Sequence, residues 1–251
     1  MTEPGTICIY GQTKIGKTSD VLYTFRDAYV IVTERDALAP VVHQFGYKPA
    51  SVKMLGSDRP YEDMLAIIDS EVRPAVATGN HPAVVLDTGT ALGSMLFRCL
   101  DKRYKSDGRK VYPKFDHQFR HILSELLLLP VWVIVLFHEQ VPKSTESAYV
   151  RGGPKTGGST ALVEDIGGMF RLVMRAAAKL GSKGQMERMY LCNSIDPQWV
   201  QGDAYGVTGA SQKMDLRPIM WRILNPGLDV PESLTAPKPY RQVQEENQVV
   251  L

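Results

Sequence analysis

The sequence is short of the features that mark secreted, metal-binding and membrane-spanning proteins. Its 251 residues include three cysteines, Cys8, Cys99 and Cys192, which lie far apart and lack the C-x-x-C spacing of a metal site. So few cysteines fit a reducing compartment better than a disulfide framework. The opening residues, MTEPG, lack the regions of a signal peptide, and the apolar runs are too short to span a bilayer. We therefore expect a cytoplasmic protein without a membrane partner.

An excess of charge of either sign is also missing. The chain carries 29 Lys and Arg against 27 Asp and Glu, which gives a formal net charge of +2. Any contact with nucleic acid must therefore depend on positive charge that is concentrated locally. The length and a hydrophobic content of 44% allow one substantial α/β domain with its own core.

The sequence does contain several short, continuous apolar runs. Residues 6–10, 28–33, 82–88 and 131–137 are typical of strands that are buried on both faces of a parallel sheet. The stretches between them show the apolar spacing of three and four that core-facing helices require, most clearly over residues 61–76 and 115–129.

The character of the chain changes after the last of these strands. Residues 142–160 are polar and rich in glycine, and the segment is too long for an ordinary connection, so we expect it to be functional or mobile. Residues 169–177 and 186–193 read as two antiparallel strands at the sheet edge, joined by a turn at 181–184. The prediction is one α/β domain over residues 1–228, followed by a flexible tail over residues 229–251.

A phosphate-binding loop follows the first strand. The segment YGQTKIGKTS, residues 10–19, matches G-x-x-x-x-G-K-[ST] directly after a strand and at the start of a helical pattern. Glycines allow backbone N–H groups to turn toward phosphates, and the helix N-terminus adds partial positive charge. Lys17 is expected to reach the β- and γ-phosphates of ATP, and the Thr18 hydroxyl to ligate Mg²⁺. The predicted nucleotide-binding residues are Gly11, Gln12, Thr13, Lys14, Ile15, Gly16, Lys17, Thr18 and Ser19.

Two carboxylates follow other predicted strands and complete the expected site. Asp87 ends a buried strand, where an acid serves as the second anchor of Mg²⁺; alternatively, Asp87 or Thr88 caps the next helix. Glu34 follows the second strand, so its carboxylate is expected at the same sheet edge as the nucleotide. There it can deprotonate the attacking water, or else it is a solvated acid paired with Arg35.

These segments resemble the core of RecA-family recombinases. The stretch from Glu34 to Gly46 is similar to the segment after that family's second core strand, whose glutamate is the catalytic base. The run VVLDTGTAL resembles its second acidic strand. The run VIVLFHEQ, residues 133–140, resembles its fourth strand, which ends in a polar sensor of the γ-phosphate. Either His138 or Gln140 takes the sensor position.

The overall layout looks closest to phage nucleotide-binding proteins of the Sak-type single-strand annealing group, over roughly residues 5–225. The resemblance implies a RecA-like fold, Mg²⁺-dependent ATP hydrolysis and a homo-oligomeric ring or filament. It also implies single-stranded DNA as a partner, with a single-strand binding protein as a possible further partner, and a location in the host cytoplasm.

Two stretches, residues 101–115 and residues 142–160, combine basic and aromatic residues in the way that single-strand binding requires. By the same resemblance they correspond to the two loops that line the DNA channel of RecA-like filaments. Alternatively, the first is a solvated basic loop and the second a mobile connector. The predicted contacts are Lys102, Arg103, Lys105, Arg109 and Lys110 in residues 101–115, and Lys143, Arg151 and Lys155 in residues 142–160.

The sequence thus predicts an ATPase that binds single-stranded DNA and acts in phage recombination or strand annealing. Two other functions are consistent with a phosphate loop. One is a small-molecule phosphotransferase in which residues 142–160 form a lid over the donor. The other is a nucleotide-switched adaptor without DNA-dependent activity.

Overall fold

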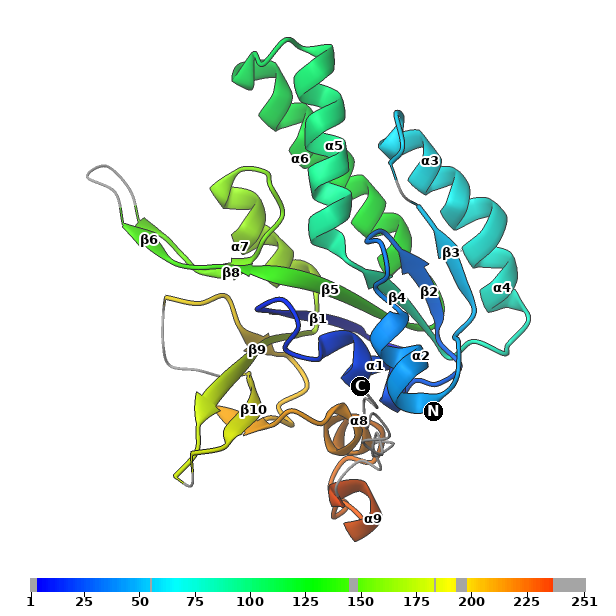
Figure 1. The fold of residues 1–251 in the computed structure, drawn as a ribbon, viewed down its shortest axis with the longest axis vertical. Helices are drawn as coiled ribbons and strands as arrows, with labels where there is room; N and C mark the ends of the chain where they lie inside the picture. Colours follow the sequence, from blue (N-terminus) through cyan, green and yellow to red (C-terminus); the bar gives the residue numbers. More distant parts are fainter. Residues whose placement is uncertain (1–3, 55, 145–148, 183, 193–197, 237–251) are drawn as a thin grey trace, which may run out of the picture.

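A single mixed sheet organises the chain. The structure, a computed structural model, describes residues 4–54, 56–144, 149–182, 184–192 and 198–236. The strand order is β12-β10-β9-β1-β5-β4-β2-β3 (Figure 1). The central strands run parallel, which confirms the predicted fold class. These parallel strands are β1 (Thr6–Gly11), β2 (Tyr29–Val32), β3 (Ser51–Lys53), β4 (Ala83–Asp87), β5 (Trp132–Gln140) and β9 (Leu172–Leu180).

Antiparallel strands extend one edge of this sheet, as predicted. Strand β10 (Met186–Leu191) pairs with β9 from Met186 opposite Leu180 to Leu191 opposite Arg175, and β12 (Ser211–Lys213) pairs with β10. Two short strands pair antiparallel with longer ones: β11 (Gly202–Asp203) pairs with β9, and β8 (Gly153–Pro154) pairs with β5. A separate ribbon pairs β6 (Lys143–Ser144) with β7 (Tyr149–Val150).

Helices cover both faces of the sheet (Figure 1). Successive residues of β1 point to opposite faces, so Cys8 and Tyr10 join one buried cluster, while Ile7 and Ile9 join the other. The cluster that contains Ile7 and Ile9 packs against α1 (Lys17–Thr24), α2 (Ala39–Phe45) and α8 (Leu216–Leu224). The cluster that contains Cys8 and Tyr10 packs against α3 (Pro60–Ile67), the π-helical turn η1 (Ile68–Val72), α4 (Arg73–Ala77), α5 (Gly89–Arg103), α6 (Gly108–Leu127) and α7 (Thr160–Met169).

The stretch 101–115 is not a loop, contrary to our expectation. It consists of the end of α5, a tight turn and the first part of α6. Asp107 caps α6, since its carboxylate accepts a hydrogen bond from the Arg109 backbone N–H at 3.2 Å. Val111 and Phe115 are buried and extend the apolar face of α6 toward its N-terminus. The basic residues of this stretch therefore lie at the tip of a helical hairpin.

Ordered structure continues past Asp229, where we expected a tail to begin. Helix α9 (Glu232–Thr235) follows α8, and the Trp221 indole N–H donates to the Asp229 carbonyl at 3.0 Å. Arg217 Nη2 donates to the Ala236 carbonyl at 2.8 Å. The rest of the predicted tail, residues 237–251, lies outside the described residues. Among the helices that the structure describes, none is both long and apolar enough to cross a membrane.

Candidate active site

The predicted phosphate loop lies at the carboxyl edge of the parallel strands, beside a cleft of about 580 Å³. All loop residues from Thr13 to Ser19 line this cleft, together with Glu34, Asp87 and His138. These side chains lie at or after the carboxyl ends of β1, β2, β4 and β5, so the parallel arrangement of the strands brings four distant parts of the sequence together. The structure therefore brings these residues, which separate motifs pointed to, together around one cleft.

The loop backbone turns into α1 at Gly16. This residue has φ 103° and ψ 15°, in the left-handed region that a glycine adopts without steric cost. The next residue begins α1, whose first N–H groups have no partner within the helix and face the side where phosphate would bind. The loop is thus shaped to surround an anion.

Lys17 is held inside the loop by hydrogen bonds to the loop backbone. Its Nζ donates to the carbonyls of Gly11 at 2.9 Å and Gln12 at 2.7 Å, and the residue is only 6% exposed. Burial lowers the pKa of Lys17 to about 8, although the nearby carboxylates of Asp87, Glu139 and Glu34 act in the opposite direction. An incoming phosphate would supply the negative charge that this ammonium needs.

Nucleotide affinity is therefore expected to depend on pH near the pKa of Lys17. Phosphate favours the charged amine, so the pKa of Lys17 rises on binding, and the protein takes up a proton at pH values above about 8. Affinity should fall as pH rises through this value, by up to about tenfold per pH unit. Titration calorimetry from pH 7 to 9.5, in buffers of different ionisation enthalpy, measures both effects. Affinity that is constant across this range, without proton uptake, would contradict the assignment.

Thr18 and Asp87 form the pair that the sequence predicted for Mg²⁺. The Thr18 hydroxyl donates to Asp87 Oδ2 at 2.9 Å across the gap between α1 and β4. Burial raises the pKa of Asp87 to about 6, partly offset by this hydrogen bond. The helix cap that the sequence allowed for either Asp87 or Thr88 is Thr88, which caps α5: its hydroxyl accepts a hydrogen bond from the Ala91 N–H at 3.1 Å. A hydroxyl and a carboxylate on one side of a phosphate loop are suitable oxygen ligands for Mg²⁺.

Glu34 points into the same cleft rather than toward Arg35. Its Oε1 accepts a hydrogen bond from the Thr88 hydroxyl at 2.8 Å and lies 3.3 Å from His138 Nε2. Thr33 holds the backbone of Thr88 in place, because its hydroxyl donates to the Thr88 carbonyl at 2.7 Å and accepts from the Thr88 N–H at 2.6 Å. The carboxylate is thus positioned at one end of the phosphate-binding cleft.

His138 and Gln140 occupy different places. His138 lines the cleft, whereas Gln140 is not among the described lining residues and its backbone pairs with Gly153 in β8. Burial lowers the pKa of His138 more than the nearby Glu34 carboxylate raises it. The geometry therefore favours His138 over Gln140 as a group that touches the nucleotide.

Several residues of the cleft were not foreseen from the sequence. Thr33 and Thr88 orient Glu34, and both directly follow buried strands, which was the available signal. Arg188 of β10 and Met214, which follows β12, close another side of the cleft. No motif marks these two residues, because only the pairing of the edge strands brings them to the loop.

Comparison with known proteins agrees with this geometry. A model of the AAA domain family matches residues 3–197. The chain belongs to this family. The AAA-family protein is thus a P-loop ATPase, a class that binds nucleotide, usually with Mg²⁺.

One solved structure gives a weaker likeness to the AAA-family chain. A KaiC-like protein from the hyperthermophilic archaeon Pyrococcus horikoshii OT3 has 16% sequence identity and a TM-score of 0.48 over 76% of this chain and 80% of that chain. Nothing about activity follows from a similarity at this level. No curated protein matches the sequence.

The predicted DNA contacts of the AAA-family protein lie in two groups. Phe115 is fully buried, so it cannot stack on a base, whereas Tyr112 is 43% exposed. In the second stretch, Lys143 and Lys155 are exposed, while Arg151 Nη2 donates to the Trp199 carbonyl at 2.7 Å. The basic side chains of the first group, around the tip of the α5–α6 hairpin, are Lys102, Arg103, Lys105, Arg109 and Lys110.

Proposed function

We propose that this AAA-family protein is a Mg²⁺-dependent ATPase that binds single-stranded DNA and acts in phage recombination or strand annealing. The observation that carries the ATPase part is the convergence of Lys17, Thr18, Asp87 and Glu34 on one cleft. Lys17 and the loop amides would hold the phosphates, and Thr18 and Asp87 would hold Mg²⁺, which would supply positive charge to neutralise the phosphate oxygens.

Glu34 has the position required of a general base. Its carboxylate accepts the proton of a water molecule that attacks the γ-phosphate in line, so the products are ADP and inorganic phosphate. The hydrogen bond from Thr88 fixes the carboxylate without neutralising it. His138, which lies 3.3 Å from Glu34, is the sensor of the γ-phosphate.

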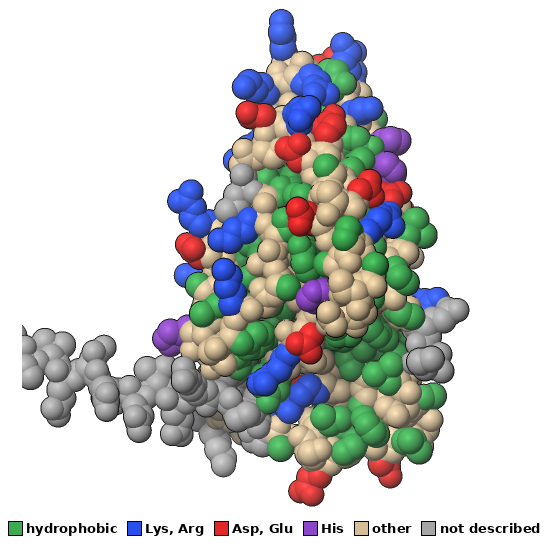
Figure 2. All heavy atoms as spheres, turned by 90° about the vertical axis from the view of Figure 1, so that its right-hand side faces the viewer, with side chains coloured by type: hydrophobic (Ala, Val, Ile, Leu, Met, Phe, Trp, Pro, Cys, Tyr) green, Lys and Arg blue, Asp and Glu red, His purple; other side chains and the backbone are tan. Residues whose placement is uncertain are grey.

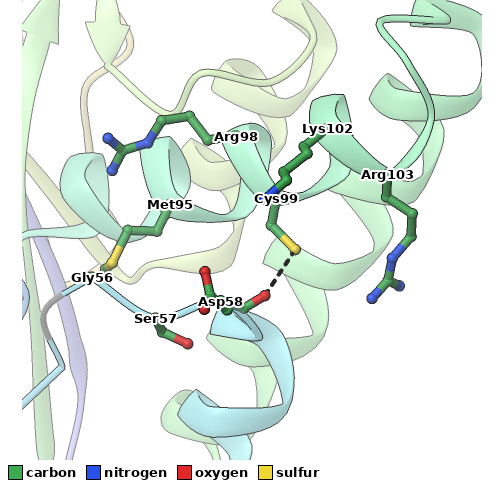
Figure 3. Close-up of a pocket in the computed structure, with 8 residues that line it drawn as sticks. All are labelled: Gly56, Ser57, Asp58, Met95, Arg98, Cys99, Lys102 and Arg103. Atoms are coloured by element: carbon green, nitrogen blue, oxygen red, sulfur yellow. Dashed lines mark hydrogen bonds between the residues drawn. The ribbon is translucent and has the colours of Figure 1, made fainter.

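The DNA part of the proposal is supported by a basic groove beside the C-terminal half of α5. Figure 3 shows Arg98, Lys102 and Arg103 on α5, next to the segment 56–58 that leads into α3. The groove has a volume of about 670 Å³, and Cys99 lies within it, with its Sγ donating to the Asp58 carbonyl at 3.4 Å. Cations that track a backbone of phosphates are the main source of affinity for single strands.

A second basic hollow lies along the first part of α6. It has a volume of about 470 Å³ and offers the Tyr104 ring beside its cations. Figure 2 shows Lys and Arg side chains gathered at the upper end of the molecule, which corresponds to the hairpin tip in Figure 1. The residues that line this hollow are Tyr104, Arg109, Lys110, Pro113, Lys114 and His117.

Helix α5 links this surface to the nucleotide cleft. It begins at Gly89, two residues after Asp87, and Lys102 lies about 20 Å away along the helix axis. Near the start of α5, the Thr90 hydroxyl accepts from the His138 backbone N–H at 2.9 Å and donates to the Lys155 carbonyl at 2.8 Å. A change at the γ-phosphate could therefore reach both basic stretches through one helix.

The DNA part is tested by removing two charges from the groove. Replacing Lys102 and Arg103 by alanine should weaken binding of an oligothymidylate and reduce the slope of log affinity against log salt by about 1.4, at about 0.7 per phosphate contact. Fluorescence anisotropy at several salt concentrations measures both quantities.

The matched control replaces Lys48 and Lys179 by alanine; both lysines are exposed and lie outside the two basic stretches. This variant loses the same charge and should keep the wild-type salt slope. If the two double variants behave alike, the groove is not the DNA site.

Cys99 provides an independent reporter of the same groove. Cys8 and Cys192 are fully buried and burial raises the pKa of both thiols, to about 11 for Cys192, so alkylation of the native protein should occur at Cys99. Bound oligothymidylate should slow this reaction. An unchanged rate with DNA bound would place the strand elsewhere.

Turnover measurements distinguish the proposal from its rivals. Stimulation of ATP hydrolysis by single-stranded DNA supports a DNA-coupled ATPase, and the proposal includes its assembly as a ring or filament. Turnover that depends on a small acceptor indicates a phosphotransferase, and slow turnover without either response indicates a nucleotide-switched adaptor.

A further inference from the structure

Arg188 lies against the phosphate loop although it belongs to the antiparallel edge of the sheet. A Cβ atom on Gly16 would lie 3.0 Å from Arg188 Nη1, so the guanidinium group is next to the turn between the loop and α1. Arg188 lines the same cleft as Lys17 and is exposed to solvent there. The side chain is therefore open to a bound ligand.

The position of Arg188 is fixed by its neighbours in β10. Arg188 and Tyr190 are two residues apart in a strand, so their side chains project from the same face of the sheet. Tyr190 is fully buried, and its hydroxyl donates to the Asp20 carboxylate in α1. The backbone at Arg188 is held as well, because its carbonyl accepts from the Met214 N–H at 3.1 Å. This face of β10 is thus attached to the helix that follows the phosphate loop.

The electrostatic surroundings of Arg188 favour an anionic ligand. The guanidinium lies beside the N-terminus of α1, where the helix dipole places partial positive charge, and shares the cleft with Lys17. Among the described residues, no carboxylate lies within ion-pair distance of Arg188. The guanidinium group and the N-terminus of α1 together attract negative charge beside Gly16.

We propose that Arg188 binds the α- and β-phosphates of the nucleotide held by its own chain. This inference rests on the proposed ATP site. Lys17 reaches the β- and γ-phosphates from within the loop, and Arg188 approaches from the edge strand, on the side of Gly16. Because guanidinium donates two parallel hydrogen bonds to phosphate oxygens, it orients the phosphates of the nucleotide as well as attracting them. The antiparallel extension of the sheet thereby contributes directly to nucleotide binding.

Replacing Arg188 by alanine tests this assignment. The dissociation constants of ADP, ATP and inorganic tripolyphosphate should each rise about tenfold, the value for one charge-assisted contact. The turnover number at saturating ATP should stay within about twofold of wild type, because the contact is present before and during the reaction. Arg188→Lys should give an intermediate loss, since it keeps the charge but not the paired donors. Calorimetry and steady-state hydrolysis provide these values.

The control and the contrary outcomes are distinct. Lys179→Ala removes an exposed cation from the adjacent strand β9 and should bind all three ligands as wild type does. Tripolyphosphate binding that is unaffected by Arg188→Ala, or a lower turnover number with unchanged affinity, would overturn the proposed phosphate contact. Failure of the wild-type protein to bind any of the three ligands would instead refute the ATP site itself, and this inference with it.

Discussion

Glu34→Gln is expected to retain ATP binding and to lose hydrolysis by about 10²- to 10⁴-fold, the usual contribution of a general base. The amide oxygen of glutamine can still accept the hydrogen bond from the Thr88 hydroxyl, which the carboxylate accepts at 2.8 Å in the wild-type protein. The substitution therefore removes the base while it keeps the position of the side chain. Phosphate release measures turnover, and calorimetry with Mg²⁺ and ATP measures binding.

Glu164→Gln is the matched control for this variant. Glu164 is exposed on α7 and is not among the described residues that line the cleft, so the same chemical change there should leave turnover as in the wild type. If Glu34→Gln hydrolyses ATP at the wild-type rate, another group activates the water. If it loses binding together with turnover, Glu34 holds the site together rather than acting as the base.

Lys17→Ala should weaken the binding of ATP and ADP by about 100-fold, the upper end for loss of one charged hydrogen-bonding partner. Lys17 is the cation inside the loop, and its Nζ lies 2.9 Å and 2.7 Å from the carbonyl oxygens of Gly11 and Gln12. Alanine leaves the loop backbone in place but removes the ammonium group. Hydrolysis at cellular ATP concentrations should fall to background as a consequence.

Lys48→Ala controls for the general loss of a positive charge, since Lys48 is exposed and is not among the described residues that line the cleft. Melting followed by circular dichroism establishes that both variants are folded. Wild-type affinity in folded Lys17→Ala would show that nucleotide binds elsewhere on the protein.

The central fold was predictable from the sequence because its signals are local. Each buried parallel strand is a continuous apolar run, and β1, β2, β4 and β5 all begin or end within two or three residues of the predicted bounds. The stretch 101–115 was misjudged because its many charges obscured the apolar positions Val111 and Phe115, and because Pro113 lies inside α6. Strand β3 has only three residues, none of them fully buried, so its pattern was too short to detect.

The site was predictable to the extent that it is encoded in motifs next to strands. Lys17, Thr18, Asp87 and Glu34 lie at or shortly after the ends of strands, and a parallel sheet places such residues on one edge. The choice between His138 and Gln140 needed the structure, because both lie in the last part of β5 and only their positions relative to the cleft differ. Arg188 was missed because it lies in the β9–β10 hairpin, and only the parallel pairing of β9 with β1 brings this hairpin to the loop.

A crystal structure with Mg²⁺ and a non-hydrolysable ATP analogue is the most direct test of the ATPase mechanism. The account predicts that Lys17 Nζ leaves the carbonyls of Gly11 and Gln12 for the β- and γ-phosphates. It also predicts that Mg²⁺ lies between Thr18 and Asp87, with a water molecule between Glu34 and the γ-phosphate. An analogue bound outside the loop, or a γ-phosphate directed away from Glu34, would contradict it.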